Sequence, residues 1–279
     1  PILDDTSRAL TALGREARRR HTGPVIGITG SVGKTSVKDL ALAAIGKTRK
    51  THASKQSFNN ELGVPLTLFN APADTEVLIV EMGARGIGHI AELCGIAAPN
   101  IGIVTYVGAV HTSEFGTVEA VAQAKGELIA ALPASGYAIL NADSPHVLAM
   151  KDTSPAPVVT YGTDGDIAAV NVVVDAKLRP SFQVVSSGGV YPVVLPVHGV
   201  HQVSNALAAL AAFAAMLQGR ALKTKKRTKL VHQLPSVAAS EKLLVNLFAT
   251  NACCSNNLFL LLNLTLFHPI KVFASTLYL

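Results

Sequence analysis

The sequence predicts an α/β fold with a mostly parallel sheet flanked by helices and a small antiparallel β excursion. From Val25 onward, short β-branched runs alternate with helix-like stretches, which is typical of a parallel sheet with helical crossovers. After Pro157 the runs become shorter and are separated by Gly, Pro and Ser. Of the 279 residues, 49% are hydrophobic and 15% charged, so most of the chain can bury a core and is not intrinsically disordered.

Apolar runs of four to six residues give the strands of the parallel sheet, and longer stretches between them give its helices. The expected strands are Val25–Thr29, Val77–Glu81, Ile101–Thr105 and Tyr137–Asn141. The expected helices run from Lys34 to about Ile45, from Ile87 to Cys94, from Val118 to Leu132 and, in an Ala-rich stretch, from Val203 to Leu217.

The antiparallel excursion is predicted from four short runs with turn residues between them. They are Val158–Tyr161, Ile167–Val174, Phe182–Val185 and Val193–Val197. We find no internal repeat.

The composition divides the chain into three parts. Residues 1–20 form one helix that we interpret as the remnant of an N-terminal domain or linker, and residues 21–219 form a central domain. Residues 220–279 are an atypical tail, since all 22 glycines lie upstream of residue 220. An out-of-frame segment explains this change better than a genuine terminal extension, which is the alternative.

Charge and cysteine content exclude several classes of protein. The net charge of +6 comes from residues 221–279, whereas residues 1–220 hold 17 basic and 17 acidic side chains, so we expect no nucleic-acid partner. The three cysteines, Cys94, Cys253 and Cys254, form neither a disulfide framework nor a zinc signature. The apolar run Leu258–Phe267 is about half of the roughly 20 residues that a spanning helix needs. We therefore expect a cytoplasmic protein without stable membrane insertion.

The strongest chemical signal is a glycine-rich segment between an expected strand and an expected helix. Backbone N–H groups of such a loop converge on phosphate oxygens, and the helix N-terminus adds its positive dipole end. Lys34 would neutralise the β- and γ-phosphates of a nucleotide, and Thr35 would coordinate Mg²⁺. The first glycine of the general phosphate-loop template would fall at Ile28, so the match is imperfect, and a purely structural turn is the alternative. The segment consists of Thr29, Gly30, Ser31, Val32, Gly33, Lys34, Thr35 and Ser36.

Three further side chains could complete a phosphoryl-transfer site. Glu81 ends a predicted parallel strand, where such sheets bind ligands, and is a candidate metal ligand. His111 follows another strand, and Lys125 lies on the next helix. Taken singly, each is more simply explained as a solvated charge, a surface histidine or an exposed helix lysine.

Seven segments in order resemble the Mur ligases of peptidoglycan synthesis, over about residues 25–217. Within that family, Asn59–Pro65 is most similar to the ligases that join D-alanyl-D-alanine to UDP-N-acetylmuramoyl-tripeptide. The segments are TGSVGKTS, SFNNELGVPLTL, EMGARGIGHI, HTSEFG, AKGEL, LNAD and HQVSNALAAL.

The resemblance implies an ATP-dependent amide-bond ligase that works through an acyl phosphate and requires ATP and Mg²⁺. It implies catalytic roles for Lys34, His111 and Lys125, the last as a carbamate that supports a second magnesium. The metal set would be Thr35, Glu81, His111 and Lys125. The phosphate loop, with His201 and Asn205 near the adenine, would bind ATP, and Asn59 and Asn60 would line the pocket for the nucleotide-peptide substrate.

Some features depart from the family pattern. Tyr106 stands where the family usually has Asn, and Gln202 where Asn often follows His. The neighbouring domains of the family are not found in this sequence, so we expect this chain to be an incomplete fragment that does not ligate by itself. The alternatives are a non-catalytic Mg·ATP-binding remnant and a related Mur or folylpolyglutamate-type ligase.

Overall fold

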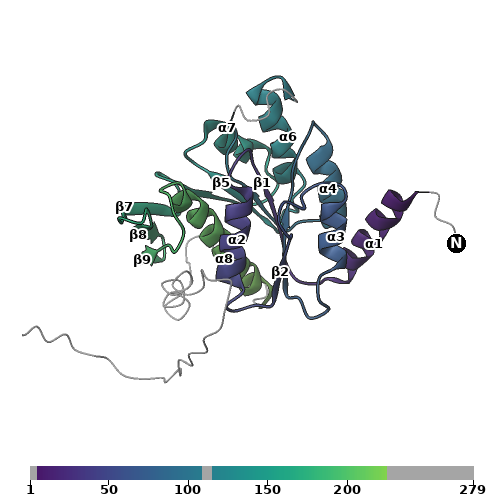
Figure 1. The fold of residues 1–279 in the computed structure, drawn as a ribbon, viewed down its shortest axis with the longest axis horizontal. Coiled ribbons are helices and arrows are strands. Elements are labelled where there is room, and N and C mark those ends of the chain that lie inside the picture. Colours follow the sequence, from purple (N-terminus) through teal and green to yellow (C-terminus); the bar gives the residue numbers. More distant parts are fainter. Residues whose placement is uncertain (1–4, 109–114, 225–279) are drawn as a thin grey trace, which may run out of the picture.

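A computed structural model describes residues 5–108 and 115–224 of the chain. Its centre is a six-stranded sheet in the order β2-β3-β1-β4-β5-β6, in which every neighbouring pair is parallel (Figure 1). The strands are β1 Val25–Thr29, β2 Thr51–Ala53, β3 Val77–Glu81, β4 Ile101–Val104, β5 Tyr137–Asn141 and β6 Val158–Tyr161.

Helices cover both faces of this sheet, as the sequence predicts. The helices are α1 Thr6–Arg20, α2 Lys34–Ile45, α3 Gly63–Phe69, α4 His89–Ala97, α6 Val118–Ala130, α7 Pro145–Leu148, the 3₁₀ helix η1 Ala149–Thr153 and α8 Gln202–Thr224.

Alternate strand residues face the two helical layers because side chains along a strand point to opposite faces. Ile26 and Ile28 pack in the cluster that includes α2 and α8, whereas Val25 packs with α3 and α4. A third cluster joins β5 to α6 and α7. All five residues of β1 are buried, so the strand that leads into the glycine-rich segment lies inside the molecule.

One strand lies in a different sheet from the one expected. The run Val158–Tyr161 was predicted for the antiparallel excursion, but β6 pairs in parallel with β5 as the last strand of the main sheet. The run has the strand propensity in either case, and only its partner differs. Local sequence does not specify that partner, so this part of the prediction was wrong.

The antiparallel excursion itself is present as a three-stranded sheet of β7 Ala168–Val174, β8 Pro180–Ser186 and β9 Gly189–Val194. Its inner face includes the buried side chains Phe182, Val184 and Val193, which belong to the same core cluster as α8. The last strand begins before the expected run Val193–Val197 and overlaps it only at Val193 and Val194, because Gly189 lies at the hairpin turn and pairs with Ser186.

The N-terminal helix is packed against the rest of the described chain. The Arg18 guanidinium donates to the carbonyls of Ala97 and Ala98 at 2.7 and 2.9 Å, which satisfies carbonyl groups at the end of α4. A side chain at Gly14 would lie 2.7 Å from the Cα of Pro65, so α1 and α3 approach closely. Among the described residues, no helix is long and apolar enough to cross a membrane.

Candidate functional site

A cavity of about 600 Å³ opens at the carboxyl edge of the parallel sheet, where β1 and β3 end. Such edges are where open α/β sheets bind ligands. Six of the residues that the sequence singles out line it: Gly30, Ser31, Lys34, Asn59, Asn60 and Lys125. The other lining residues are Ser57, Glu61, Gly83, Ala84, Arg85, His89, Glu92, Leu93 and Phe115.

The glycine-rich segment forms a tight loop between β1 and α2. Gly30 and Gly33 have φ angles of +149° and +86°, which L side chains rarely adopt. A side chain at Gly30 would also collide with the Thr105 hydroxyl. Gly33 is the N-cap of α2 and provides no side-chain cap, so the first N–H groups of α2 are left for a ligand.

Two residues that directly follow β4, the strand next to β1, hold this loop in place. The Thr105 hydroxyl donates to the Val32 carbonyl at 2.5 Å, and the Ser31 N–H donates to the Tyr106 carbonyl at 2.7 Å. Tyr106 therefore serves the loop through its backbone, which any residue type provides. Sequence reasoning missed Thr105, since a threonine at a strand end carries no signal of this contact.

The rest of the segment differs in exposure. Thr29 is fully buried, and its hydroxyl has no hydrogen-bond partner within the described residues. Val32 is half exposed at the tip of the loop, and Ser36 is partly buried on α2.

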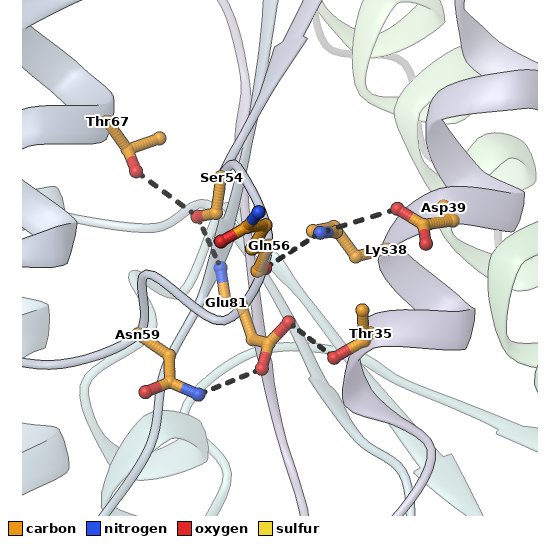
Figure 2. Close-up of polar contacts among 8 residues, drawn as sticks. All are labelled: Thr35, Lys38, Asp39, Ser54, Gln56, Asn59, Thr67 and Glu81. Carbon is orange, nitrogen blue, oxygen red and sulfur yellow. Dashed lines mark hydrogen bonds and ion pairs between the residues drawn. The ribbon is translucent and has the colours of Figure 1, made fainter. Parts of the chain in front are cut away.

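Glu81 is the centre of the polar network beside the loop (Figure 2). Its carboxylate accepts hydrogen bonds from the Thr35 hydroxyl at 3.0 Å and from the Asn59 amide at 2.9 Å. Its own N–H donates to Ser54 Oγ at 3.1 Å. The side chain is only 1% exposed and makes no ion pair within the described residues.

A buried carboxylate whose hydrogen-bond partners are all neutral fits a cation site, because burial of a charge without an ion-pair partner is costly. Oxygen donors of carboxylate and hydroxyl type are those that Mg²⁺ prefers. The described residues contain no cluster of three or more acidic, histidine or cysteine side chains that could hold a metal. Glu81 and Thr35 offer two such oxygen donors side by side, 3.0 Å apart.

Lys34 and Lys125 bring two amines into the same cavity. Lys34 Nζ donates to the Gly30 carbonyl at 2.7 Å. Burial lowers the pKa of Lys34, and the Glu81 carboxylate opposes that shift. Burial and, second, the charge of Lys34 lower the pKa of Lys125 to about 8. Lys125 is 5% exposed, and a pKa of about 8 leaves about a tenth of this protected amine neutral at pH 7.

The two asparagines differ in what they contact. Asn59 binds Glu81, and its carbonyl accepts the Gly83 N–H at 2.7 Å. The Asn60 side-chain oxygen accepts the Gly63 N–H at 2.9 Å at the start of α3. The side-chain oxygen of Asn60 thus caps the start of α3, and the residue also lines the cavity.

Asn205 lies next to the phosphate loop although it is far from it in sequence. A side chain at Gly33 would be 2.7 Å from Asn205 Oδ1. The Asn205 amide donates to Gln202 Oε1 at 3.0 Å, so Gln202 orients it. His201 is exposed just before α8 and does not line the cavity. His111 lies outside the described residues.

A parallel sheet with a glycine-rich loop between β1 and α2 defines an α/β domain of the P-loop class. The family model for the Mur ligase middle domain matches residues 28–213. The chain therefore belongs to the Mur ligase family.

Known relatives agree with this assignment. The chain is 48% identical over 189 residues to the UDP-N-acetylmuramoyl-tripeptide–D-alanyl-D-alanine ligase of Mycobacterium bovis, which covers 67% of this chain and 37% of that protein. The Escherichia coli ligase of the same name is 33% identical over 214 residues and covers 75% of this chain and 47% of its own. The chain thus spans less than half the length of these relatives.

A solved structure is also similar to this chain. The structure of MurF ligase from Thermotoga maritima in complex with ADP superposes with a TM-score of 0.69 at 26% identity, over 81% of this chain and 52% of that chain.

Proposed function

We propose that this chain is the ATP-binding domain of a ligase that joins D-alanyl-D-alanine to UDP-N-acetylmuramoyl-tripeptide. The observation that carries the proposal is the Thr35–Glu81 pair beside a phosphate loop whose cavity also holds Lys34 and Lys125. The relatives named above support the choice of substrates. Consumption of ATP and of a nucleotide-linked precursor favours a cytoplasmic location.

Each residue has a role in this chemistry. The backbone of Gly30–Gly33 and the N-terminus of α2 bind the nucleotide phosphates, and Lys34 leaves the Gly30 carbonyl to contact them. Glu81 and Thr35 would hold a magnesium ion, which would offset the negative charge of the phosphates. The resemblance adds His111 and carbamylated Lys125 to the metal site, Asn59 and Asn60 to the peptide pocket, and His201 and Asn205 to the adenine.

The reaction joins a carboxylate to an amine. The carboxylate oxygen of the tripeptide attacks the γ-phosphorus of ATP and ADP leaves, which gives an acyl phosphate. The amine of D-alanyl-D-alanine then attacks the acyl carbon, loses a proton and expels phosphate. Lys34 and the metal site reduce the repulsion between the carboxylate and the phosphate as they approach. No protein nucleophile is needed.

Calorimetry with Mg·ADP tests the nucleotide site. We expect Lys34→Ala to weaken binding by about 10- to 100-fold, since one charge-assisted contact contributes about 1.5–3 kcal/mol. Lys177→Ala is the matched control, because Lys177 is exposed on the turn between β7 and β8. Equal affinities of wild type and Lys34→Ala would contradict the assignment of the loop.

Phosphate release separates ligation from simple nucleotide binding. Release from ATP that requires both UDP-N-acetylmuramoyl-tripeptide and D-alanyl-D-alanine identifies the proposed ligase. Binding without release is what we expect of this domain by itself, and it is also what the second candidate, a non-catalytic nucleotide-binding remnant, would give. Release with a different acid in place of the tripeptide would identify a related ligase.

A further inference from the structure

Lys38 is a buried cation that neither the phosphate loop nor the metal site uses. It lies on α2 one turn beyond Lys34 and is 3% exposed. Its ammonium donates to the Gln56 carbonyl at 3.0 Å and lies 3.3 Å from the Asp39 carboxylate (Figure 2). The Asp39 side chain is 64% exposed, so water weakens that ion pair. The contact that anchors the buried end of Lys38 is the Gln56 carbonyl.

The backbone at Gln56 needs such an anchor. Its φ angle is +46°, in the left-handed region that residues other than glycine rarely adopt. Unusual backbone conformations of this kind persist where surrounding contacts fix them. A buried ammonium also requires partners for its N–H groups, so each group stabilises the other.

Gln56 lies in the segment that carries residues of the cavity wall. Ser54 is fixed to β3, because its N–H donates to the Ile79 carbonyl at 3.0 Å. After Gln56 the chain turns, with the Phe58 N–H bound to the Lys55 carbonyl at 3.1 Å, and Ser57, Asn59 and Asn60 line the cavity. Helix α2 therefore contacts this segment directly through Lys38 at Gln56, and indirectly because Thr35 and Asn59 both donate to the Glu81 carboxylate of β3.

We propose that Lys38 is a positioning residue that fixes segment 55–60 to α2 and so couples nucleotide binding at the start of α2 to the opposite wall of the cavity. The positioning part rests on contacts within the chain alone. The coupling part rests on the proposed function, because it requires that a nucleotide bind at the phosphate loop.

Amide hydrogen exchange of the full chain tests the positioning part. The reporters are the Phe58 amide and the Gly83 amide, which donates to the Asn59 carbonyl at 2.7 Å. The reference is the Thr105 amide, bound to the Thr29 carbonyl at 3.0 Å. Lys38→Met keeps the length of the side chain and removes its charge and its donors. We expect at least tenfold faster exchange at the reporters, with the reference within twofold of wild type.

Two matched variants separate the contacts of Lys38. Asp39→Asn removes the ion pair and keeps the Gln56 contact, and we expect wild-type exchange. Lys38→Arg keeps a donor at this position, and we expect it to restore at least part of the protection. Wild-type exchange at the reporters in Lys38→Met, or equal acceleration at the reference, would overturn the proposal.

A glycine at position 56 keeps the test decisive if Lys38→Met folds poorly. Gln56→Gly removes the conformational penalty and keeps the carbonyl that accepts from Lys38. We expect the double variant Lys38→Met/Gln56→Gly to fold and to recover part of the lost protection. No recovery at the reporters in the folded double variant would mean that Lys38 does not act through this turn.

Mg·ADP tests the coupling part. In wild type we expect bound Mg·ADP to slow exchange of the Phe58 amide at least threefold. In Lys38→Met we expect Mg·ADP to bind with an affinity within threefold of wild type but no longer to slow this exchange. Slowing that persists in Lys38→Met contradicts the coupling. If wild type does not bind Mg·ADP, the proposed function fails and the coupling with it, while the exchange rates without nucleotide still decide the positioning role.

Discussion

Lys125 is a buried amine whose protonation affects the stability of the chain. Its pKa falls from the ordinary 10.5 to about 8 in the folded chain, through burial and the neighbouring Lys34. The unfolded chain therefore binds more protons than the folded chain between these two values. The contribution of Lys125 to the free energy of unfolding is least favourable below pH 8 and improves as the pH rises toward 10.5.

We expect Lys125→Met to stabilise the chain at pH 7 by about 1–3 kcal/mol, because the variant no longer buries a cation. We also expect a flatter dependence of stability on pH between 8 and 10 than in wild type. Urea unfolding at several pH values measures both effects. Lys177→Met, at an exposed position, is the control. A variant that is less stable than wild type at pH 7, with an unchanged pH dependence, would refute this account.

The same amine is suited to react with CO₂, since only a neutral amine forms a carbamate. A pKa of about 8 makes roughly half of Lys125 neutral at pH 8 and about a tenth at pH 7. With ¹³C-labelled CO₂ at constant dissolved concentration, we expect a carbamate resonance in the ¹³C NMR spectrum that grows over this range. The resonance should be missing in Lys125→Met. Its presence at equal intensity in that variant would assign it to another amine.

Two helices that line the cavity are tied together by Glu127 of α6. Its carboxylate accepts the Gly88 N–H at 2.5 Å and the Ala91 N–H at 2.9 Å, at the N-terminus of α4. Gly88 is the N-cap of α4 and has no side chain, so Glu127 provides the cap from another element.

We expect Glu127→Ala to cost about 1–2 kcal/mol of stability, the usual cost of a lost cap. In this variant, exchange of the Gly88 and Ala91 amides should be faster than in wild type, whereas exchange of the Thr105 amide should be unchanged. Glu119→Ala, on the exposed first turn of α6, is the matched control, and chemical denaturation with amide exchange measures both variants. If both variants lose equal stability, the two contacts to α4 contribute nothing.

Strands that are buried over their whole length could be predicted to within one residue, since the expected run Ile101–Thr105 exceeds β4 by only Thr105. The runs Val25–Thr29, Val77–Glu81 and Tyr137–Asn141 coincide with β1, β3 and β5, because continuous apolar segments are typical of central parallel strands. Thr51–Ala53 was not predicted, since it has only three half-buried residues. Helix α3 was missed as well, because it is short and contains Pro65.

The candidate site was predictable where residue type and position in the fold coincide. Gly30, Lys34, Glu81 and Lys125 combine a specific residue type with a strand end or helix, and the structure brings them to one edge of the sheet. Thr105 and Ser54 were not predictable. Their hydroxyls contact the Val32 carbonyl of the loop and the Glu81 N–H of β3, both distant in sequence, and no local pattern encodes such contacts.

The last described helix completes a core that begins almost 180 residues earlier. Helix α8 packs with α2 and with strands β4, β5 and β6, and it carries Asn205 to the phosphate loop. The side chain of Phe213 is 1% exposed in this cluster. The stability of the domain and the geometry of the cavity edge thus depend on the same packing.

We expect Phe213→Ala to lower the free energy of unfolding by about 3–5 kcal/mol, the cost of an aromatic cavity in a core. Phe69→Ala is the matched control, because Phe69 is 53% exposed, and it should cost less than about 1 kcal/mol.

Mg·ADP at 100 times its Kd should raise the free energy of unfolding of each variant by about 2.7 kcal/mol, since a ligand of the folded state stabilises by mass action. Urea unfolding with and without Mg·ADP measures all of these quantities. Equal losses from the two substitutions would show that α8 does not close the core. If Mg·ADP failed to stabilise only Phe213→Ala, the nucleotide site would instead depend on the packing of α8.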